Sequence, residues 1–338
     1  MNSLSFFRPE QGACTIPPAQ AKGEGDRQVL RLEQVLAMLL GSQARNLEAQ
    51  TGAPQSSLLV VLAVPPALEA QPGGAAAVHT AARIAGMENV RLVPTTTALA
   101  WHYSERHGKD IADADAPHTV LIVDVGHMAW YETHKKTQTH PHTPAHTHIH
   151  RHTHTHTHSS AVVARYTPRE GANGGKEIEL EILAQGGSFE VGGGVFDAAL
   201  SQRIKEKLVK EHGADACRGA QFDFRLGKAC EKLKKLLSTV DPAKLDLDSL
   251  IPDKDCRLTV TRKEWELLLE PSLARLKWLV TEVLAQSEVP PDGLEGVEVV
   301  GGGARVPAVG ETILSCTAHD SLRHTLDSSA GARSYALI

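Results

Sequence analysis

The chain is poor in aromatic side chains, which make up only 4% of its 338 residues. Since 41% of the residues are hydrophobic, it can still bury a large core, which must be aliphatic and rich in alanine. Its five cysteines are scattered and form no CxxC pair, which is typical of reduced thiols in an intracellular protein and not of a disulfide framework. The length favours two or more domains or lobes.

An excess of basic residues is also missing. The formal charge is −5 and the pI is about 6.4, which argues against a nucleic-acid partner. No apolar run approaches the roughly 20 residues that span a bilayer, so no membrane partner is expected. The first 28 residues lack the sustained apolar segment of a secretory signal. We therefore expect a cytoplasmic protein, with the nucleus as a second compartment.

Residues 1–28 are rich in Pro, Gly and polar side chains without any period, which predicts a disordered N-terminus. Beyond them, segments with a helical period alternate with short apolar runs, and this alternation indicates an α/β architecture. We expect helices over 30–52, 75–85, 97–107, 197–212, 224–239 and 262–286, the last as one long helix or two in tandem. We expect strands over 57–64, 90–93, 119–125, 177–184 and 297–300, and a strand–turn–strand unit over 245–260.

Residues 134–158 form a low-complexity tract that holds ten of the eighteen histidines, many of them alternating with threonine. Such a tract cannot bury enough apolar surface to fold alone, so we predict a disordered His-rich insertion over 134–176. Metal binding or a pH switch is an alternative, because imidazole ligates Zn²⁺ and Cu²⁺ and titrates near neutrality. A non-functional fragment or mispredicted gene product, with the tract as a translated non-coding repeat, is another.

The stretch VEVVGGGARVPAV, residues 297–309, joins a short apolar run to three consecutive glycines. Because Gly301, Gly302 and Gly303 have no Cβ, a ligand can lie against bare backbone there. The N–H groups of such a turn and of the following helix start suit a phosphate or a nucleoside. A tight strand-to-helix turn with a surface arginine, Arg305, is the alternative interpretation.

Five motifs in order resemble the nucleotide-binding domain of the heat shock protein 70 family, a member of the actin-like ATPase superfamily. They are RIAGMENVRLVPTTTALAWHYSE (83–105), VLIVDVGHMAW (120–130), FEVGGGVFDAAL (189–200), CEKLKKLLST (230–239) and VEVVGGGARVPAV (297–309). The resemblance implies a two-lobed actin-like ATPase (ribonuclease H-like) fold with an incomplete N-terminal lobe. It places a partial first lobe and the second phosphate loop in 29–133, and a second lobe with the adenosine motif in 177–335.

The segment DVGH, residues 124–127, looks like the loop of the heat shock protein 110 (Sse-like) branch. Proteins of this branch act as nucleotide-exchange factors and bind unfolded polypeptides. The resemblance therefore implies a truncated, ATP-binding chaperone or co-chaperone domain that assists protein folding. Its expected partners are a heat shock protein 70 chaperone and unfolded polypeptides.

The resemblance also implies a site for ATP or ADP. Asp124 and Gly126 match the second phosphate loop, and Gly192 and Gly193 match a phosphate-side turn. Asp124 could also hold Mg²⁺ through water, since hard cations take carboxylate oxygens. Nucleoside contacts are expected from Glu231, Lys234, Lys235, Ser238, Gly301, Gly302, Gly303 and Arg305. The first four share one helix face at i, i+3, i+4 and i+7, although a solvated charged face would show the same spacing.

The chain departs from the family where hydrolysis is concerned. Nothing in residues 1–60 resembles the family's glycine–threonine hairpin or its catalytic lysine. Thr95 and Tyr131 stand where the family has a catalytic glutamate and an aspartate. Because hydrolysis needs Mg²⁺, an ordered water and charge compensation, we expect it to be weak or absent. An active ATPase of the same superfamily is the alternative.

Overall fold

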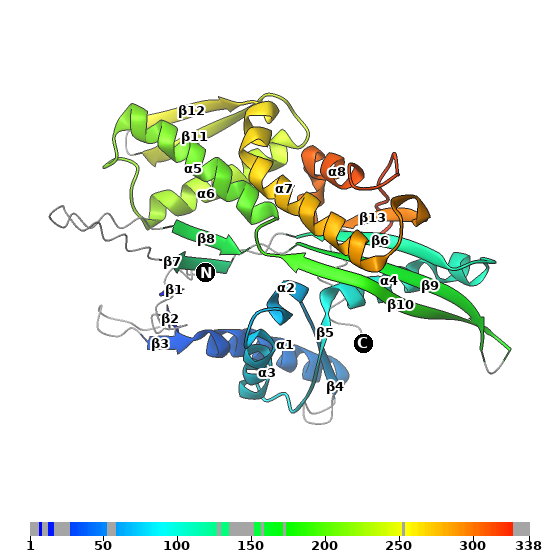
Figure 1. The fold of residues 1–338 in the computed structure, drawn as a ribbon. Helices are drawn as coiled ribbons and strands as arrows, with labels where there is room; N and C mark the ends of the chain where they lie inside the picture. The colour runs from blue at the N-terminus through cyan, green and yellow to red at the C-terminus, as the bar shows by residue number, and fades with distance from the viewer. Residues whose placement is uncertain are drawn as a thin grey trace, which may run out of the picture. The chain divides into compact units, whose positions relative to one another are not determined.

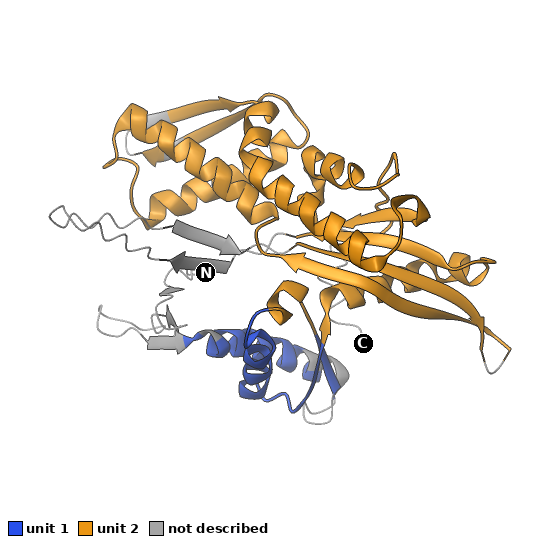
Figure 2. Cartoon of the chain, viewed as in Figure 1, with its two compact units in different colours: residues 1–62, 71–92, 129–156 blue, residues 63–70, 93–128, 157–338 orange. Residues whose placement is uncertain are grey.

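The structure is a computed structural model. It describes residues 7–8, 13–16, 28–52, 59–126, 130–134, 152–156, 159–171, 174–251 and 254–326. The chain divides into two compact units (Figure 2). Unit 1 comprises residues 1–62, 71–92 and 129–156, and unit 2 comprises residues 63–70, 93–128 and 157–338.

Helices α1 (Leu32–Thr51) and α3 (Gly74–Ile84) form the centre of unit 1. They pack through a small cluster that includes buried Ala44, Ala82 and Met87. The helices predicted over 30–52 and 75–85 are therefore confirmed. Strands β4 (Leu59–Val64) and β5 (Asn89–Pro94), which pair with each other, confirm two of the predicted strands. Helix α2 (Pro66–Glu69), a single turn, belongs to unit 2.

Unit 1 also contains short strands within or at the edge of two ranges for which the sequence predicted disorder, 1–28 and 134–176. Strands β1 (Phe7–Arg8), β2 (Ala13–Ile16) and β3 (Gln28–Arg31) form a three-stranded sheet. Strands β7 (Trp130–His134) and β8 (His152–His156) pair with each other. The rest of 1–28 and of the His-rich tract lies outside the described residues, and the metal and pH interpretations of the tract remain predictions.

A four-stranded sheet with the order β10–β9–β6–β13 organises unit 2 (Figure 1). Its strands are β6 (His118–Val125), β9 (Ser159–Glu170), β10 (Lys176–Ser188) and β13 (Gly296–Val300). β6 is antiparallel to β9 and parallel to β13. Every residue of β6 after His118 is buried, as expected for a central strand covered on both faces.

Successive side chains of β6 point to opposite faces of the sheet, and both faces carry apolar residues. Helices therefore cover both faces and bury them. Val120 and Ile122 join a cluster with Leu99 and Tyr103 of α4. The alternate side chains of β6 join the larger cluster beneath the remaining helices. The described helices of unit 2 that are longer than one turn are α4 (Thr95–Ala112), α5 (Gly193–His212), α6 (Ala220–Leu237), α7 (Arg262–Ser287) and α8 (Pro307–Leu314).

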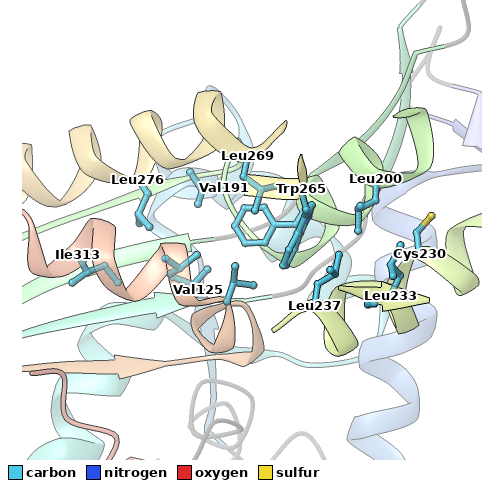
Figure 3. Packing of buried hydrophobic residues seen from close by; sticks show 14 of the residues in the cluster. Val125, Val191, Leu200, Cys230, Leu233, Leu237, Trp265, Leu269, Leu276 and Ile313 are labelled. Carbon is cyan, nitrogen blue, oxygen red and sulfur yellow. The ribbon is translucent and has the colours of Figure 1, made fainter. Parts of the chain in front are cut away.

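The larger cluster fixes the helices around the end of β6. Figure 3 shows Trp265 of α7 packed among Leu233 and Leu237 of α6, with Val125 and Val191 close by. Trp265 is fully buried, and its helix starts with a capping box in which Thr261 accepts a hydrogen bond from the Glu264 N–H. α7 confirms a single long helix over the range 262–286. Leu233 and Leu237 of α6 belong to the same buried cluster as Val125, the last residue of β6.

The hairpin β11 (Ala243–Ile251) and β12 (Lys254–Val260) confirms the strand–turn–strand unit predicted over 245–260. Short 3₁₀ turns, η4 (Pro291–Gly293) and η5 (Gly302–Arg305), flank β13. Proline is the first residue of α8, where its missing N–H costs nothing.

Two predicted boundaries differ from the structure. The insertion was predicted over 134–176, but Ser159–Glu170 form β9, whose first six residues are buried between β6 and β10. This segment folds because SSAVVARY supplies small and β-branched residues to a covered strand. In addition, the range 29–133, which was predicted to hold a partial first lobe and the second phosphate loop, is divided between the two units, with α4 and β6 in unit 2.

The His-rich tract joins two adjacent strands. Val125 pairs with Ser159, so residues 126–158 form the connection of an antiparallel β6–β9 pair that two to five residues could close. We predict that replacing 127–158 with Asn-Gly leaves unit 2 folded. Unit 2 should gain about 2 kcal/mol, because closing a shorter loop costs less entropy. Urea unfolding followed by circular dichroism measures this gain.

A chain carrying a Gly/Ser linker of the same length as 127–158 is the matched control. It changes composition but not loop length, so its unfolding midpoint should stay near that of the original chain. Loss of cooperative unfolding in the Asn-Gly variant alone would show that the sheet needs the length of this connection, contrary to the prediction.

Candidate functional site

The glycine turn after β13 lies directly against the end of β6. Val300 is the register partner of Asp124, and Gly301 follows with a positive φ of 88°. A Cβ on Gly301 would stand 2.5 Å from both Asp124 Oδ1 and the Val125 carbonyl oxygen. Gly303 is equally confined, since its Cβ would lie 2.8 Å from the Val125 oxygen. Only glycine therefore allows this turn to meet the Asp124 loop.

A second glycine turn meets the same loop from α5. The Gly193 N–H donates a hydrogen bond of 3.0 Å to the Gly126 carbonyl oxygen. Gly192 caps α5 with a φ of 136°, a backbone conformation that other residues rarely adopt. The positive end of the α5 dipole thus lies beside the β6 loop, which favours an anion there.

Lys234 of α6 is tied to this second turn. Its ammonium group donates to the Gly193 carbonyl oxygen at 3.1 Å and to Asp197 Oδ2 at 2.8 Å. The side chains of Lys234 and Asp197 are only 10% and 13% exposed, so this ion pair is shielded from water. Ser238 Oγ donates to the Lys234 carbonyl oxygen one turn further on.

The outer ridge of α6 carries the other predicted nucleoside contacts. Lys235 donates a hydrogen bond of 2.9 Å to Glu231, and Lys228 donates one of 3.2 Å. These hydrogen bonds, that from Lys235 first, lower the pKa of Glu231 to about 2. Glu231 is therefore ionised at neutral pH and flanked by two cations, an arrangement that can accept hydrogen bonds from ribose hydroxyls.

Asp124 lies at the centre of the site with little compensation for its charge. Burial raises the pKa of its carboxyl to about 6. Its register partner on β9 is Ser160, which is 1% exposed and whose hydroxyl has no hydrogen-bond partner in the described part of the chain. Tyr131, which stands where the family has an aspartate, is a residue of β7 in unit 1.

The structure connects most of the predicted site residues through direct contacts. Gly301 touches Asp124, Gly126 bonds to Gly193, and Gly193 bonds to Lys234. Gly302 and Arg305 are exposed on η5, and nothing within 4 Å would meet a Cβ on Gly302. All of these residues belong to unit 2. Whether they contact a nucleotide remains a prediction.

Sequence reasoning missed three residues that build the site. Val125 supplies the backbone on which Gly301 and Gly303 pack, Ser160 stands beside Asp124, and Asp197 holds Lys234. Asp197 carried a detectable signal, since it is an acidic residue one turn after a glycine triplet. Ser160 carried none, because its strand follows directly on the His-rich tract.

Two further surveys apply to the described ranges alone. No helix among them is both long and apolar enough to cross a bilayer. They also contain no cluster of three or more His, Cys, Asp or Glu side chains arranged to hold a metal ion.

A model of the family described as Hsp70 protein matches residues 12–131 and 173–330. A heat shock protein homolog of the Sse type from Eremothecium gossypii is 30% identical over 87% of this chain and 36% of that protein. Heat shock protein hsp88 of Neurospora crassa is 28% identical over 69% of this chain and 28% of that protein. Heat shock 70 kDa protein 14 of Arabidopsis thaliana is 29% identical over 69% of this chain and 23% of that protein.

The chain thus spans about a third or less of the length of these relatives. The gap in the family match, 132–172, contains both the described part of the tract and β9. The Sse-type relative carries the name of the branch that the DVGH segment indicated. The chain belongs to the heat shock protein 70 family, and its fold is the actin-like ATPase fold that the five motifs predicted.

Proposed function

We propose that this chain binds ATP or ADP through unit 2, as the nucleotide-binding part of a chaperone or co-chaperone. The observation that carries the proposal is the convergence of two glycine turns on the end of β6. Gly301 leaves no room for a Cβ against Asp124 and Val125, and Gly193 bonds to Gly126. Bare backbone and a helix N-terminus at one place suit the phosphates of a nucleotide.

The other end of the nucleotide would meet α6 and η5. Glu231, held ionised between Lys228 and Lys235, can accept hydrogen bonds from the ribose. Arg305 is exposed at the end of η5, where a guanidinium can stack on the face of a purine. Gly302 leaves open space in front of the same turn.

Mg²⁺ fits the phosphate end of this site. Asp124 offers a buried carboxylate, and the Ser160 hydroxyl, which has no partner among the described residues, lies beside it on the next strand. Oxygen donors of this kind suit a hydrated hard cation that is also bound by nucleotide phosphates. Mg²⁺, when bound, would neutralise phosphate charge, while Asp124 and Ser160 would hold its water shell in place.

Titration calorimetry with ATP, ADP and GTP tests the nucleotide proposal. We expect saturable heat for ATP and ADP, and binding of GTP weaker by about tenfold or more, equivalent to about 1.4 kcal/mol of lost purine contact. The absence of saturable heat with either adenine nucleotide would contradict the proposal.

Hydrolysis is proposed to be weak or absent. Asp124 has a neutral hydroxyl, Ser160, as its neighbour on β9, so this pair offers a single carboxylate to hold the Mg²⁺ that hydrolysis needs. Phosphate release measured on the purified chain should therefore stay near that of buffer. Release well above buffer that Asp124→Ala abolishes would instead establish an active ATPase.

We further propose that the protein acts on a heat shock protein 70 partner in the cytoplasm or nucleus, where it promotes nucleotide exchange and contacts unfolded polypeptides. The similarity to relatives of the Sse type supports this role. Release of a fluorescent ADP analogue from a heat shock protein 70 chaperone should accelerate when this chain is added. An unchanged release rate at saturating concentrations of the chain would contradict the exchange role.

A further inference from the structure

The backbone of Gly193 is held from both sides, by two hydrogen bonds. Its N–H donates to the Gly126 carbonyl oxygen at 3.0 Å, and its C=O accepts from the Lys234 ammonium at 3.1 Å. Gly126 ends the Asp124 loop, which is the phosphate side of the proposed site. Lys234 belongs to α6, which is the nucleoside side. The backbone of one residue, Gly193, therefore connects the two ends of the site.

Asp197 fixes the lysine in this position. Its Oδ2 atom lies 2.8 Å from Lys234 Nζ, and neither side chain is more than 13% exposed. Asp197 stands one turn into α5, the helix that Gly193 begins. Removing one partner of a shielded ion pair leaves an uncompensated buried charge, which is energetically costly. The ion pair with Asp197 therefore holds the Lys234 ammonium in place.

We propose that Lys234 is a positioning residue that sets the Gly192–Gly194 turn against the Gly126 loop, in place of the direct nucleoside contact that helical spacing predicts. This rests on the proposed nucleotide function. Lys234 would act on the phosphates through Gly193 and Gly126, since its ammonium is occupied by Asp197 and the Gly193 carbonyl. The outer ridge of Glu231 and Lys235 would be left to contact the nucleoside.

Two readouts on the full chain separate positioning from contact. The first is calorimetric affinity for ATP and for adenosine with Lys234→Met and Asp197→Asn. Both variants should weaken the binding of ATP by about tenfold, equivalent to about 1.4 kcal/mol, and leave the affinity for adenosine nearly unchanged. The second is the hydrogen-exchange rate of the Gly193 amide in ¹⁵N-glycine-labelled protein. This rate should rise by at least about tenfold in both variants, equivalent to about 1.4 kcal/mol of lost protection.

Lys232→Met is the matched control, since Lys232 is an exposed lysine on the same helix and lies outside the proposed site. Lys232→Met should change neither the affinity for ATP or adenosine nor the exchange rate of the Gly193 amide. Asp197→Asn retains the side-chain shape, so it keeps the test available if Lys234→Met fails to fold.

An equal loss of ATP and adenosine affinity in Lys234→Met, with Gly193 exchange unchanged, would overturn the proposal and make Lys234 a direct contact. If the original chain bound neither ATP nor ADP, the nucleotide function would fail. Exchange at Gly193 would then still decide whether Lys234 holds the turn, and unchanged protection in both variants would refute that role.

Discussion

Gly301→Ala is expected to destabilise unit 2 by about 3–5 kcal/mol and to abolish nucleotide binding. The new Cβ would lie 2.5 Å from Asp124 Oδ1 and from the Val125 carbonyl oxygen, which belongs to the β6 backbone and cannot move without breaking the sheet. Alanine would also be strained at a φ of 88°. Urea unfolding and ATP titration measure the two effects.

Gly302→Ala is the matched control on the neighbouring residue. Nothing within 4 Å would meet its Cβ, so the free energy of unfolding should change by less than about 1 kcal/mol. If a nucleotide lies against this turn, the added methyl group should still weaken ATP binding. A Gly301→Ala protein as stable as the original would show that the turn can move away from Asp124, contrary to the structure.

The sequence was sufficient to predict the core of the site where local pattern and backbone chemistry agree. Residues 297–300 read as a buried strand, the glycines required a turn, and Pro307 marked a helix start, all of which the structure confirms in β13, η5 and α8. These features depend on neighbours within a few residues, and that is the range over which periodicity and glycine content are informative.

Contacts between distant residues could not be predicted in the same way. The Val125–Ser159 pairing spans the His-rich tract, so β9 looked like part of the insertion. Lys234 shares a helical face with Glu231 and Lys235, but helical spacing does not show which edge of that face turns inward. Asp197, 37 residues earlier in the chain, decides this by pairing with Lys234.

Asp124→Asn should stabilise the protein at pH 7.5 by about 3 kcal/mol in the absence of divalent cations. Burial raises the pKa of Asp124 in the folded state from 3.8 to about 6, so ionising it costs folding free energy. Below pH 3.8 both the folded and the unfolded state are protonated, and the cost vanishes. The cost grows as pH rises toward 6 and is complete above it, at about 1.4 kcal/mol for each pH unit that separates the two pKa values.

Urea unfolding of both proteins in EDTA at several pH values between about 4 and 8 measures this stability gap. The gap should be small at the acid end of this range and reach its full size near neutrality. Asp246→Asn, at an exposed carboxylate of β11, controls for the loss of one negative charge and should show no such growth. A gap that fails to grow with pH would mean that Asp124 has a charge partner that the fold does not show.

ATP with Mg²⁺ should then narrow the gap at neutral pH by stabilising the original chain more than Asp124→Asn, because only an ionised carboxylate attracts the hydrated cation. A buried, uncompensated carboxylate lowers stability, and proteins retain such groups mainly at functional sites. Equal stabilisation of the two proteins by ATP and Mg²⁺ would remove Asp124 from the metal side of the site while leaving the glycine turns as the nucleotide contact.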